Sequence, residues 1–514
     1  MDLNLAIVVL YLVAMLAFGF WGRSRTKNSS DYLVAGRRLG YFLYTGTMTA
    51  VVLGGASTVG GVGLGYKMGL SGMWLVVAIG VGVLLLSLLF AGTIQKLRVY
   101  SVSEMLDLRY GHKATGASSI VMLAYTIFLS VTSTGAYATV LHVLLGWDRW
   151  LCIVVGGGVV LVYSVIGGMW SITLADQVQF IIKTIGIFAL MLPFTLSKAG
   201  GFDGIRERMG DQAFNLIGDK NFGADPQTIL TWFVVFTLGL LIGQDIWQRV
   251  FTARSPEVAR WGGAAAGIYC IFYGAAGAVI GMAAHASLGD KIKVKDDVYA
   301  EVADKILPAG IGGLVLAAAV AVAVAAMVST ASGALIAAAT VARNDVVPMI
   351  TGKAKATGES AEDPHSDKNI RENRTWVLGL GIVIIAIAAW MSSLKAGGDI
   401  VVASLTIAYD ILVGGLLIAI LGGFVWKRGN GQGAAASMIV GTVVTLGTMA
   451  VLAVQLGDPL LGILDNKPIY FGLLASLVTF VAVSLATKPV RPEVREEWDA
   501  RVSGRIETEG VRTS

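Results

Sequence analysis

Charged residues are scarce in this chain of 514 residues: they make up only 14% of it, whereas soluble domains average about 25%. Hydrophobic residues make up 55%, and the mean hydropathy is +0.72. The net charge of +5 is small, and no basic patch with interleaved aromatic residues occurs, which argues against a nucleic-acid partner. The composition therefore predicts an integral membrane protein.

Cysteine and histidine are also rare, which argues against two further classes. The two cysteines, Cys152 and Cys270, lie inside apolar runs and indicate neither a disulfide framework nor a zinc site. The four histidines show no metal-ligand spacing, and neither a nucleophile elbow nor an H-E-x-x-H motif is present. We therefore do not expect an enzyme.

A secretory signal is not predicted at the N-terminus. The first four residues lack a basic region, the apolar run to Trp21 is long enough to span a bilayer, and no small-residue cleavage site follows. We interpret this run as a retained helix.

Apolar stretches long enough to cross a bilayer recur along the chain. A span needs about 20 apolar residues, and helices are the only option because no ten-residue stretch alternates with a period of two. The thirteen predicted spans are 3–22, 41–66, 73–96, 117–146, 151–170, 174–197, 228–251, 261–287, 309–341, 375–393, 400–425, 433–456 and 467–487.

Lysine and arginine are concentrated in the odd-numbered loops, for example from Arg23 to Arg38 and from Arg343 to Arg374. Because such loops stay in the cytoplasm, we expect the N-terminus outside, the C-terminus inside, and a location in the bacterial cytoplasmic membrane. The charged tail after Pro489 is interpreted as a solvated end.

The second span contains a glycine pair, Gly54 and Gly55, that weakens a helix in its middle. Unwinding there would free the carbonyl groups of Ala50 and Leu53, which lie on one face. Free carbonyls at this depth line a cavity or hold an ion. The alternative is close helix packing through small residues.

The ninth span places Ser329 and Thr330 three and four residues after Ala326. Sodium is a hard cation that prefers oxygen ligands, so two hydroxyls and three carbonyls would form a five-oxygen site. The alternative is that these hydroxyls donate hydrogen bonds to carbonyls one turn earlier.

Two acidic residues are predicted inside spans, where ionisable groups are costly. Asp176 either caps the sixth span or attracts a cation near the inner exit. Gln244 and Asp245 in the seventh span either contact substrate, or Asp245 pairs with Arg249 one turn later.

Four segments together give the chain a resemblance to the sodium/solute symporter family, which includes sodium–galactose, sodium–proline and sodium–sialic acid carriers. The resemblance runs to about residue 487. The four segments are the loop Asp31-Tyr-Leu-Val-Ala-Gly-Arg37-Arg38, the stretch from Gly167 to Gln179, the segment from Gln248 to Arg254, and the helix with Ser329 and Thr330.

The resemblance implies an all-α integral membrane protein with a LeuT-like fold, in which two inverted five-helix repeats each open with a broken helix. The glycines at 54–55 and 239–243 fall where this fold implies the two breaks. The implied divisions are an N-terminal helix and loop (1–40), a first repeat (41–198), a second repeat (199–425), two C-terminal helices (426–488) and a cytoplasmic tail (489–514). The implied sodium ligands are Ala50, Leu53, Ala326, Ser329 and Thr330. Some members hold a second sodium ion, here expected at Asp176 and Ser332, but position 333 is glycine where those members have a hydroxyl, which favours one sodium.

The solute is less well indicated. Positions that match sugar contacts in the galactose carriers are Val52, Ala56 and Ser57, and the proline carriers have an aspartate at the position of Val52. Asp245, if unpaired, favours an amine, amino acid or urea-like solute over a monocarboxylate.

The resulting hypothesis is a sodium-coupled symporter that imports a small polar solute, with sodium, solute and the bilayer as partners and no obligate protein partner. Two alternatives remain: a proton-coupled or uncoupled carrier of the same fold, and a solute sensor acting through a separate protein.

Overall fold

The computed structural model describes residues 13–14, 17–27, 29–97, 99–111, 114–219, 222–292, 294–306, 330–351, 367–392 and 400–503. The predicted spans 3–22, 309–341 and 375–393 lie partly outside these residues. The predicted sodium ligands Ala326 and Ser329 lie wholly outside them.

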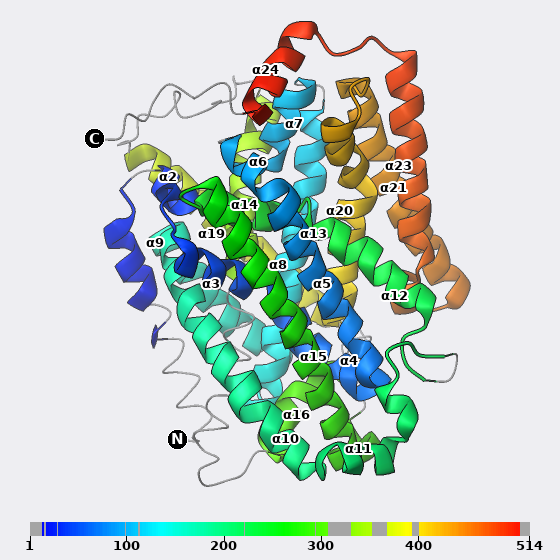
Figure 1. The fold of residues 1–514 in the computed structure, drawn as a ribbon. Coiled ribbons are helices and arrows are strands. Elements are labelled where there is room, and N and C mark those ends of the chain that lie inside the picture. Colours follow the sequence, from blue (N-terminus) through cyan, green and yellow to red (C-terminus); the bar gives the residue numbers. More distant parts are fainter. Residues whose placement is uncertain are drawn as a thin grey trace.

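Long helices that run between two ends of one bundle make up the described part of the chain (Figure 1). Up to residue 198 the α-helices are α2 (Ser29–Val34), α3 (Tyr41–Val52), α4 (Gly61–Met68), α5 (Trp74–Leu85), α6 (Gly92–Lys96), α7 (Val102–Tyr110), α8 (Thr115–Leu145), α9 (Arg149–Thr184) and α10 (Leu192–Lys198). From there to residue 425 they are α11 (Gly201–Met209), α12 (Pro226–Trp232), α13 (Leu238–Leu240), α14 (Gln244–Thr252), α15 (Gly263–Leu288), α16 (Val298–Lys305), α18 (Val347–Thr351), α19 (Asp367–Ser392) and α20 (Ile400–Val425), together with an apolar span over Thr330–Thr351. The last are α21 (Gly431–Leu456), α22 (Pro459–Leu464), α23 (Lys467–Ala486) and α24 (Pro492–Ser503).

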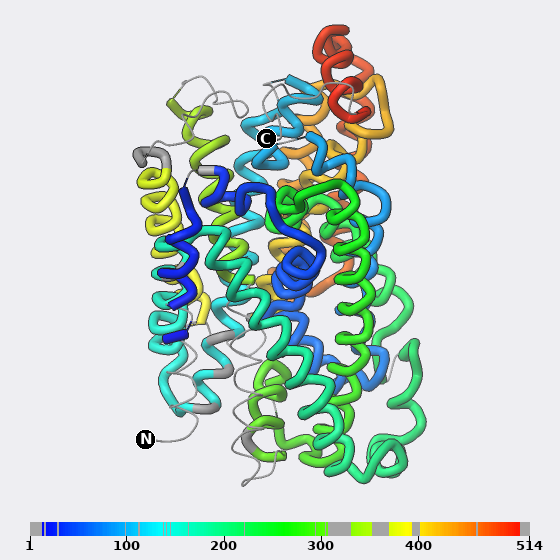
Figure 2. Tube along the Cα trace, turned by 60° about the vertical axis from the view of Figure 1, so that its left-hand side comes forward, coloured from blue at the N-terminus to red at the C-terminus, as the bar shows by residue number. Residues whose placement is uncertain are grey.

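Helix α3 lies at mid-height of the bundle in both views (Figure 1, Figure 2). It packs against α9 and α15, and its residues from Gly46 to Val52 are buried. None of its residues is charged. The backbone of its second half is therefore shielded from lipid, which is the condition under which an irregular backbone is tolerated at membrane depth.

Helix α9 consists of two helices joined at Gly168, where φ is 56° and ψ is −146°. A Cβ atom at this position would lie 2.6 Å from the ring of Tyr32 and 2.7 Å from its carbonyl oxygen. Glycine is needed both for the positive φ and for this close approach. The break lies at Gly168, inside the predicted span 151–170 and a few residues before its predicted end.

The last helices form one side of the bundle. Helices α21 and α23 pack against each other and against α20, and the short helix α24 lies against α6 and α7 at one end of the bundle (Figure 2). Within the described stretches, nine helices are long and apolar enough to cross a membrane, or ten if the bent pair α12–α14 is one span. The thirteen spans, the orientation of the termini and the repeat boundaries remain predictions.

Candidate functional site

The second predicted span is interrupted where the glycine pair predicts. Helix α3 ends at Val52, Leu53 has φ −85° and ψ 63°, and a helical backbone resumes at Gly55. The hydroxyl of Ser57 donates a hydrogen bond of 3.1 Å to the carbonyl oxygen of Val52. The interruption thus leaves the carbonyl groups at the end of α3 without helical partners. The hydroxyl of Ser57 is the partner of the Val52 carbonyl.

A second interruption separates α13 from α14, which are bent by 44° as parts of one span. Gly243 has an extended backbone, with φ −66° and ψ 131°. The indole N–H of Trp247 donates to the carbonyl oxygen of Leu241 at 2.8 Å, which satisfies one acceptor at the break. The predicted break at 239–243 is therefore present, and α14 starts at mid-bundle with its N-terminus near the break of α3.

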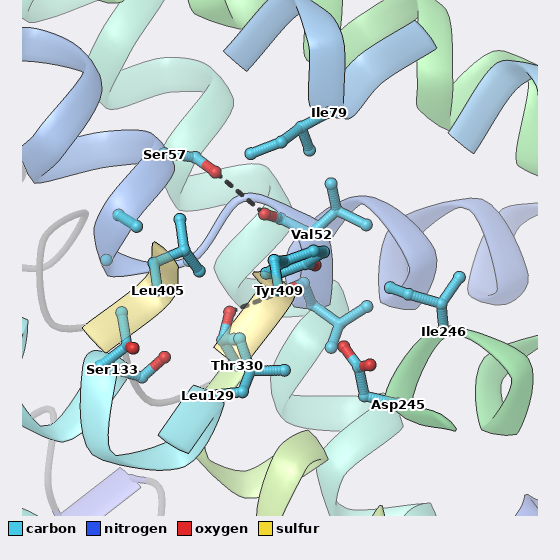
Figure 3. Close-up of a pocket in the computed structure, with 15 residues that line it drawn as sticks. Val52, Ser57, Ile79, Leu129, Ser133, Asp245, Ile246, Thr330, Leu405 and Tyr409 are labelled. Carbon is cyan, nitrogen blue, oxygen red and sulfur yellow. Dashed lines mark hydrogen bonds between the residues drawn. The ribbon is translucent and has the colours of Figure 1, made fainter. Parts of the chain in front are cut away.

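A small cavity lies between the two interruptions (Figure 3). Of the predicted solute contacts, Val52, Ala56, Ser57 and Asp245 line it. Sequence reasoning missed the rest of its wall, which comes from other helices: Ile79, Leu129, Thr132, Ser133, Leu405 and Tyr409. The cavity is mostly apolar with a few polar groups, as small-molecule sites are.

Asp245 is the charged group of this cavity. Its carboxylate accepts a hydrogen bond of 2.8 Å from the hydroxyl of Tyr125, and the side chain is buried. Backbone N–H groups of Asp245 and Ile246, at the start of α14, also act on this carboxylate. The alternative that Asp245 pairs with Arg249 is wrong, because the guanidinium of Arg249 lies instead on Asp176.

Gln244 requires a correction. It was expected to contact solute, but its side chain does not line the cavity. Its Oε1 atom accepts from the backbone N–H of Val102 at 2.7 Å, and its Nε2 atom donates to the carbonyl oxygen of Tyr100 at 3.0 Å. Gln244 therefore fastens α14 to the chain segment before α7.

Thr330 is the one hydroxyl ligand of the predicted sodium site that the structure describes. It lines the cavity wall beside α3, and its hydroxyl donates to the carbonyl oxygen of Val51 at 2.7 Å (Figure 3). A Cβ atom on Gly54 would lie 2.2 Å from the hydroxyl oxygen of Thr330. The two spans expected to share a cation are therefore in direct contact at this point.

The carbonyl groups of Ala50 and Leu53 have a partner that sequence reasoning missed. The Nζ atom of Lys183 donates to the oxygen of Ala50 at 3.0 Å and to that of Leu53 at 2.8 Å. Lys183 is wholly buried. The available signal was a lysine in the middle of the apolar span 174–197, because an ionisable residue at that depth needs a partner.

Asp176 lies inside the second half of α9, eight residues after the break at Gly168, so its interpretation as a helix cap is wrong. Its carboxylate accepts from the guanidinium of Arg249 at 3.2 Å and from the hydroxyl of Thr47. A Cβ atom on Gly333 would lie 2.9 Å from that guanidinium. Asp176 is thus paired with the guanidinium of Arg249. Ser332, the other residue expected at a second sodium site, is buried and directly precedes Gly333.

Two broken helices meeting at a mid-bundle cavity define a carrier-type membrane protein, because such breaks place polar backbone groups around a central site. The model of the Sodium:solute symporter family matches residues 32–441. The chain belongs to the sodium:solute symporter family.

Several relatives are similar to this chain in sequence. It is 24% identical to sodium/glucose cotransporter 4 of Danio rerio, covering 97% of this chain and 81% of that protein, and 25% identical to sodium/myo-inositol cotransporter 2 of Mus musculus, covering 97% and 79%. High affinity choline transporter 1 of Homo sapiens is 25% identical over 50% of this chain and 45% of that protein.

A Na+-coupled sialic acid symporter, in a substrate-bound outward-open state, has a similar structure, with a TM-score of 0.74 at 18% identity over 96% of this chain and 99% of that one. MHP1, a nucleobase-cation-symport-1 family transporter, gives a TM-score of 0.52 at 16% identity, covering 93% and 99%. The fold is LeuT-like, as predicted. The protein is a multi-pass transport protein and not an enzyme, and its family supports sodium as the coupling ion.

Proposed function

We propose that this chain is a sodium-coupled symporter that imports a small polar solute bearing an amine or ammonium group across the bacterial cytoplasmic membrane. The observation that carries the choice of solute is the carboxylate of Asp245 at the central cavity. Coupling to sodium is supported by the family. A cytoplasmic first loop is supported by its run of basic residues.

The volume of the cavity favours a small solute. Its volume is about 30 Å³, which is room for one or two water molecules, since one water needs about 10–15 Å³. The walls contributed by Ile79, Leu129 and Leu405 are aliphatic, and the hydroxyls of Thr132, Ser133 and Ser57 are the neutral polar groups. Such a site suits a compact solute with one strongly polar end.

The charge of the cavity favours a cationic end. Within the described part of the chain, no arginine, lysine or histidine nitrogen lies within 4.0 Å of the Asp245 carboxylate. The charge of Arg249 acts on this carboxylate from a distance, but its guanidinium pairs with Asp176. A buried carboxylate without a cation in contact attracts an opposite charge. The second-ranked class, the monocarboxylates, would place two negative groups in one small cavity.

An aromatic ring stands next to this carboxylate. The rings of Tyr125 and Tyr409 lie edge to face, with centroids 5.5 Å apart, and Phe236 meets the ring of Tyr409 at 5.3 Å. Tyr409 lines the cavity. An ammonium group over an aromatic face gains about 0.5–2 kcal/mol, so carboxylate and ring together suit an amine. The partial match to a choline transporter agrees with this chemistry.

Transport is proposed to follow alternating access. The broken helices α3–α4 and α13–α14 rock relative to the surrounding helices, and the cavity opens first to one side and then to the other. Ion and solute are coupled because each binds better to one conformation, and this coupling is reciprocal.

The test is uptake by full-length protein in proteoliposomes under an inward sodium gradient, with radiolabelled choline, alanine, urea, acetate and myo-inositol as probes. We expect choline or alanine to enter at least tenfold faster than acetate or myo-inositol. Asp245→Asn should remove that preference. Asp290→Asn, which changes a carboxylate whose side chain is 95% exposed, is the matched control. Faster entry of acetate, or an unchanged preference in Asp245→Asn, would contradict the proposal.

A further inference from the structure

The side chain of Lys183 occupies the place predicted for the first sodium ion. It reaches from the second half of α9 to the end of α3, and its Nζ atom lies within hydrogen-bond distance of both carbonyl oxygens freed by the break, 3.0 Å from Ala50 and 2.8 Å from Leu53. The side chain is 0% exposed. These two oxygens were the main-chain ligands expected from α3.

A sodium ion and this ammonium group exclude each other. Both would use the same two oxygens, so they would lie within a few ångströms of each other. At 4 Å two unit positive charges repel by about 4 kcal/mol at an effective dielectric constant of 20. A fixed side chain needs no diffusing partner to fill the position, whereas an ion has to be drawn from solution.

The contact between α3 and the span over Thr330–Thr351 forms without an ion. Thr330 donates its hydroxyl proton to the carbonyl oxygen of Val51 at 2.7 Å, and it approaches Gly54 so closely that a side chain there would collide with it. Sodium was expected to bridge these two segments. In this chain a direct hydrogen bond joins them, and Lys183 holds the neighbouring carbonyls from the other side.

We propose that Lys183 is the built-in cation of this position, and that the ion exchanged there with the solution is the proton on its Nζ atom rather than Na+. The reason is that a sodium ion leaves a site by diffusion, whereas a tethered ammonium group cannot. The one diffusible species it can release is its proton, which passes from Nζ to a water molecule and leaves a neutral amine and a hydronium ion. Any sodium ion that this chain couples binds outside the carbonyl pair of Ala50 and Leu53.

None of the described charged and titratable groups around Lys183 supplies another cation to the carbonyl oxygens of Ala50 and Leu53. On its own helix, Asp176 lies seven residues earlier, and that carboxylate already pairs with Arg249 of α14. On α15, the thiol of Cys270 is the other group that acts on its charge. Helix α3 contributes no carboxylate and no cation. No second cation contacts the two carbonyl oxygens among the described residues.

The inference rests on the proposed solute transport and replaces sodium by a proton at this one position, and its first test needs no solute. Equilibrium binding of ²²Na⁺ is measured on purified full-length wild type, Lys183→Ala and Lys183→Met, with Lys198→Ala, an exposed lysine on α10, as the matched control. We expect at least tenfold more bound ²²Na⁺ at 1 mM sodium in Lys183→Ala than in wild type, because the carbonyl oxygens are vacated. Lys198→Ala should match wild type.

If both Lys183 variants fail to fold, ²²Na⁺ binding to wild type still tests the proposal. Saturable ²²Na⁺ binding to wild type that Thr330→Val removes would overturn the proposal, because it would place sodium at the junction of α3 and the Thr330–Thr351 span. Equal ²²Na⁺ binding by folded wild type and Lys183→Ala would overturn it as well.

The second test uses whichever probe solute wild type carries. We expect uptake in sodium-free potassium medium to rise with an inward proton gradient, and Lys183→Ala to lose this response while Lys198→Ala keeps it. Uptake that needs sodium and ignores the proton gradient would overturn the inference and leave the proposed symport intact. If no probe solute enters, the proposed function is contradicted. The ²²Na⁺ binding experiment then still tests the inference by itself.

Discussion

The guanidinium of Arg249 lies 3.2 Å from the carboxylate of Asp176, although 73 residues separate the two in sequence. The side chains are 0% and 1% exposed. This ion pair joins the second broken helix, through α14, to the second half of α9, the helix that also carries Lys183. The three ionisable side chains therefore lie around the break of α3.

Removing one member of this pair is expected to destabilise the fold strongly. Arg249→Met leaves the Asp176 carboxylate buried without its cation, and breaking such a buried pair costs about 3–5 kcal/mol. Thermal unfolding in detergent checks this. Arg206→Met is the control, because its partner Asp211 is 85% exposed, and an exposed pair contributes about 1 kcal/mol or less. Equal losses in both variants would refute the difference.

Gly333→Ala should displace the guanidinium of Arg249. The added Cβ atom would lie 2.9 Å from a guanidinium nitrogen and 3.0 Å from a methyl carbon of Val51, and overpacking of this kind costs about 1–3 kcal/mol. The matched change is Gly379→Ala on α19, where no atom lies within 4 Å of the new carbon. We expect a lower unfolding temperature for the first variant alone. An unchanged unfolding temperature in Gly333→Ala would show that the guanidinium moves freely.

Gln244→Ala separates a fastening role from a solute-binding role. The substitution leaves the N–H of Val102 and the carbonyl oxygen of Tyr100 without the partners they have now, at about 1–3 kcal/mol for each buried group. The unfolding temperature should fall, while the relative uptake rates of the five probe solutes should stay as in wild type. A changed solute preference would indicate that Gln244 contacts the solute.

Tyr125→Phe should weaken binding of an amine without abolishing it. The lost hydroxyl donates to Asp245 at 2.8 Å, and a hydrogen bond to a charged group contributes about 1.5–3 kcal/mol. The carboxylate then loses one of the contacts that hold it at the cavity, so we expect the Kd for choline or alanine to rise roughly tenfold or more, since 1.4 kcal/mol is tenfold in affinity. Competition binding measures it, and an unchanged Kd would exclude a positioning role for Tyr125.

Much of the fold follows from local properties of the sequence. The lengths of the apolar runs predict the spans, and glycines at 54–55 and 239–243 mark the two breaks because a backbone without Cβ is the easiest to unwind. The boundary at Gly168 was also recognisable within a few residues. The count of thirteen spans stays a prediction, since parts of three of them lie outside the described residues.

The site was predictable only in part, and the failures share one cause. Gln244 and Asp245 are adjacent in sequence, yet one side chain reaches back to Tyr100 and the other faces the cavity. The pairing of Arg249 with Asp245 satisfied the i,i+4 rule within a helix, but a carboxylate from α9 is the closer partner. Spacing along one helix cannot reveal what another helix brings to it.

By itself, the sequence determined that the chain belongs in a bilayer and at which two places its helices break, because each depends on residues within about 20 positions of one another. Only the tertiary structure decided what fills the break in α3. The carbonyl oxygens of Ala50 and Leu53 need a partner that donates to them. Packing of α9 against α3 brings the side chain of Lys183 to that place, although Leu53 lies 130 residues away in sequence.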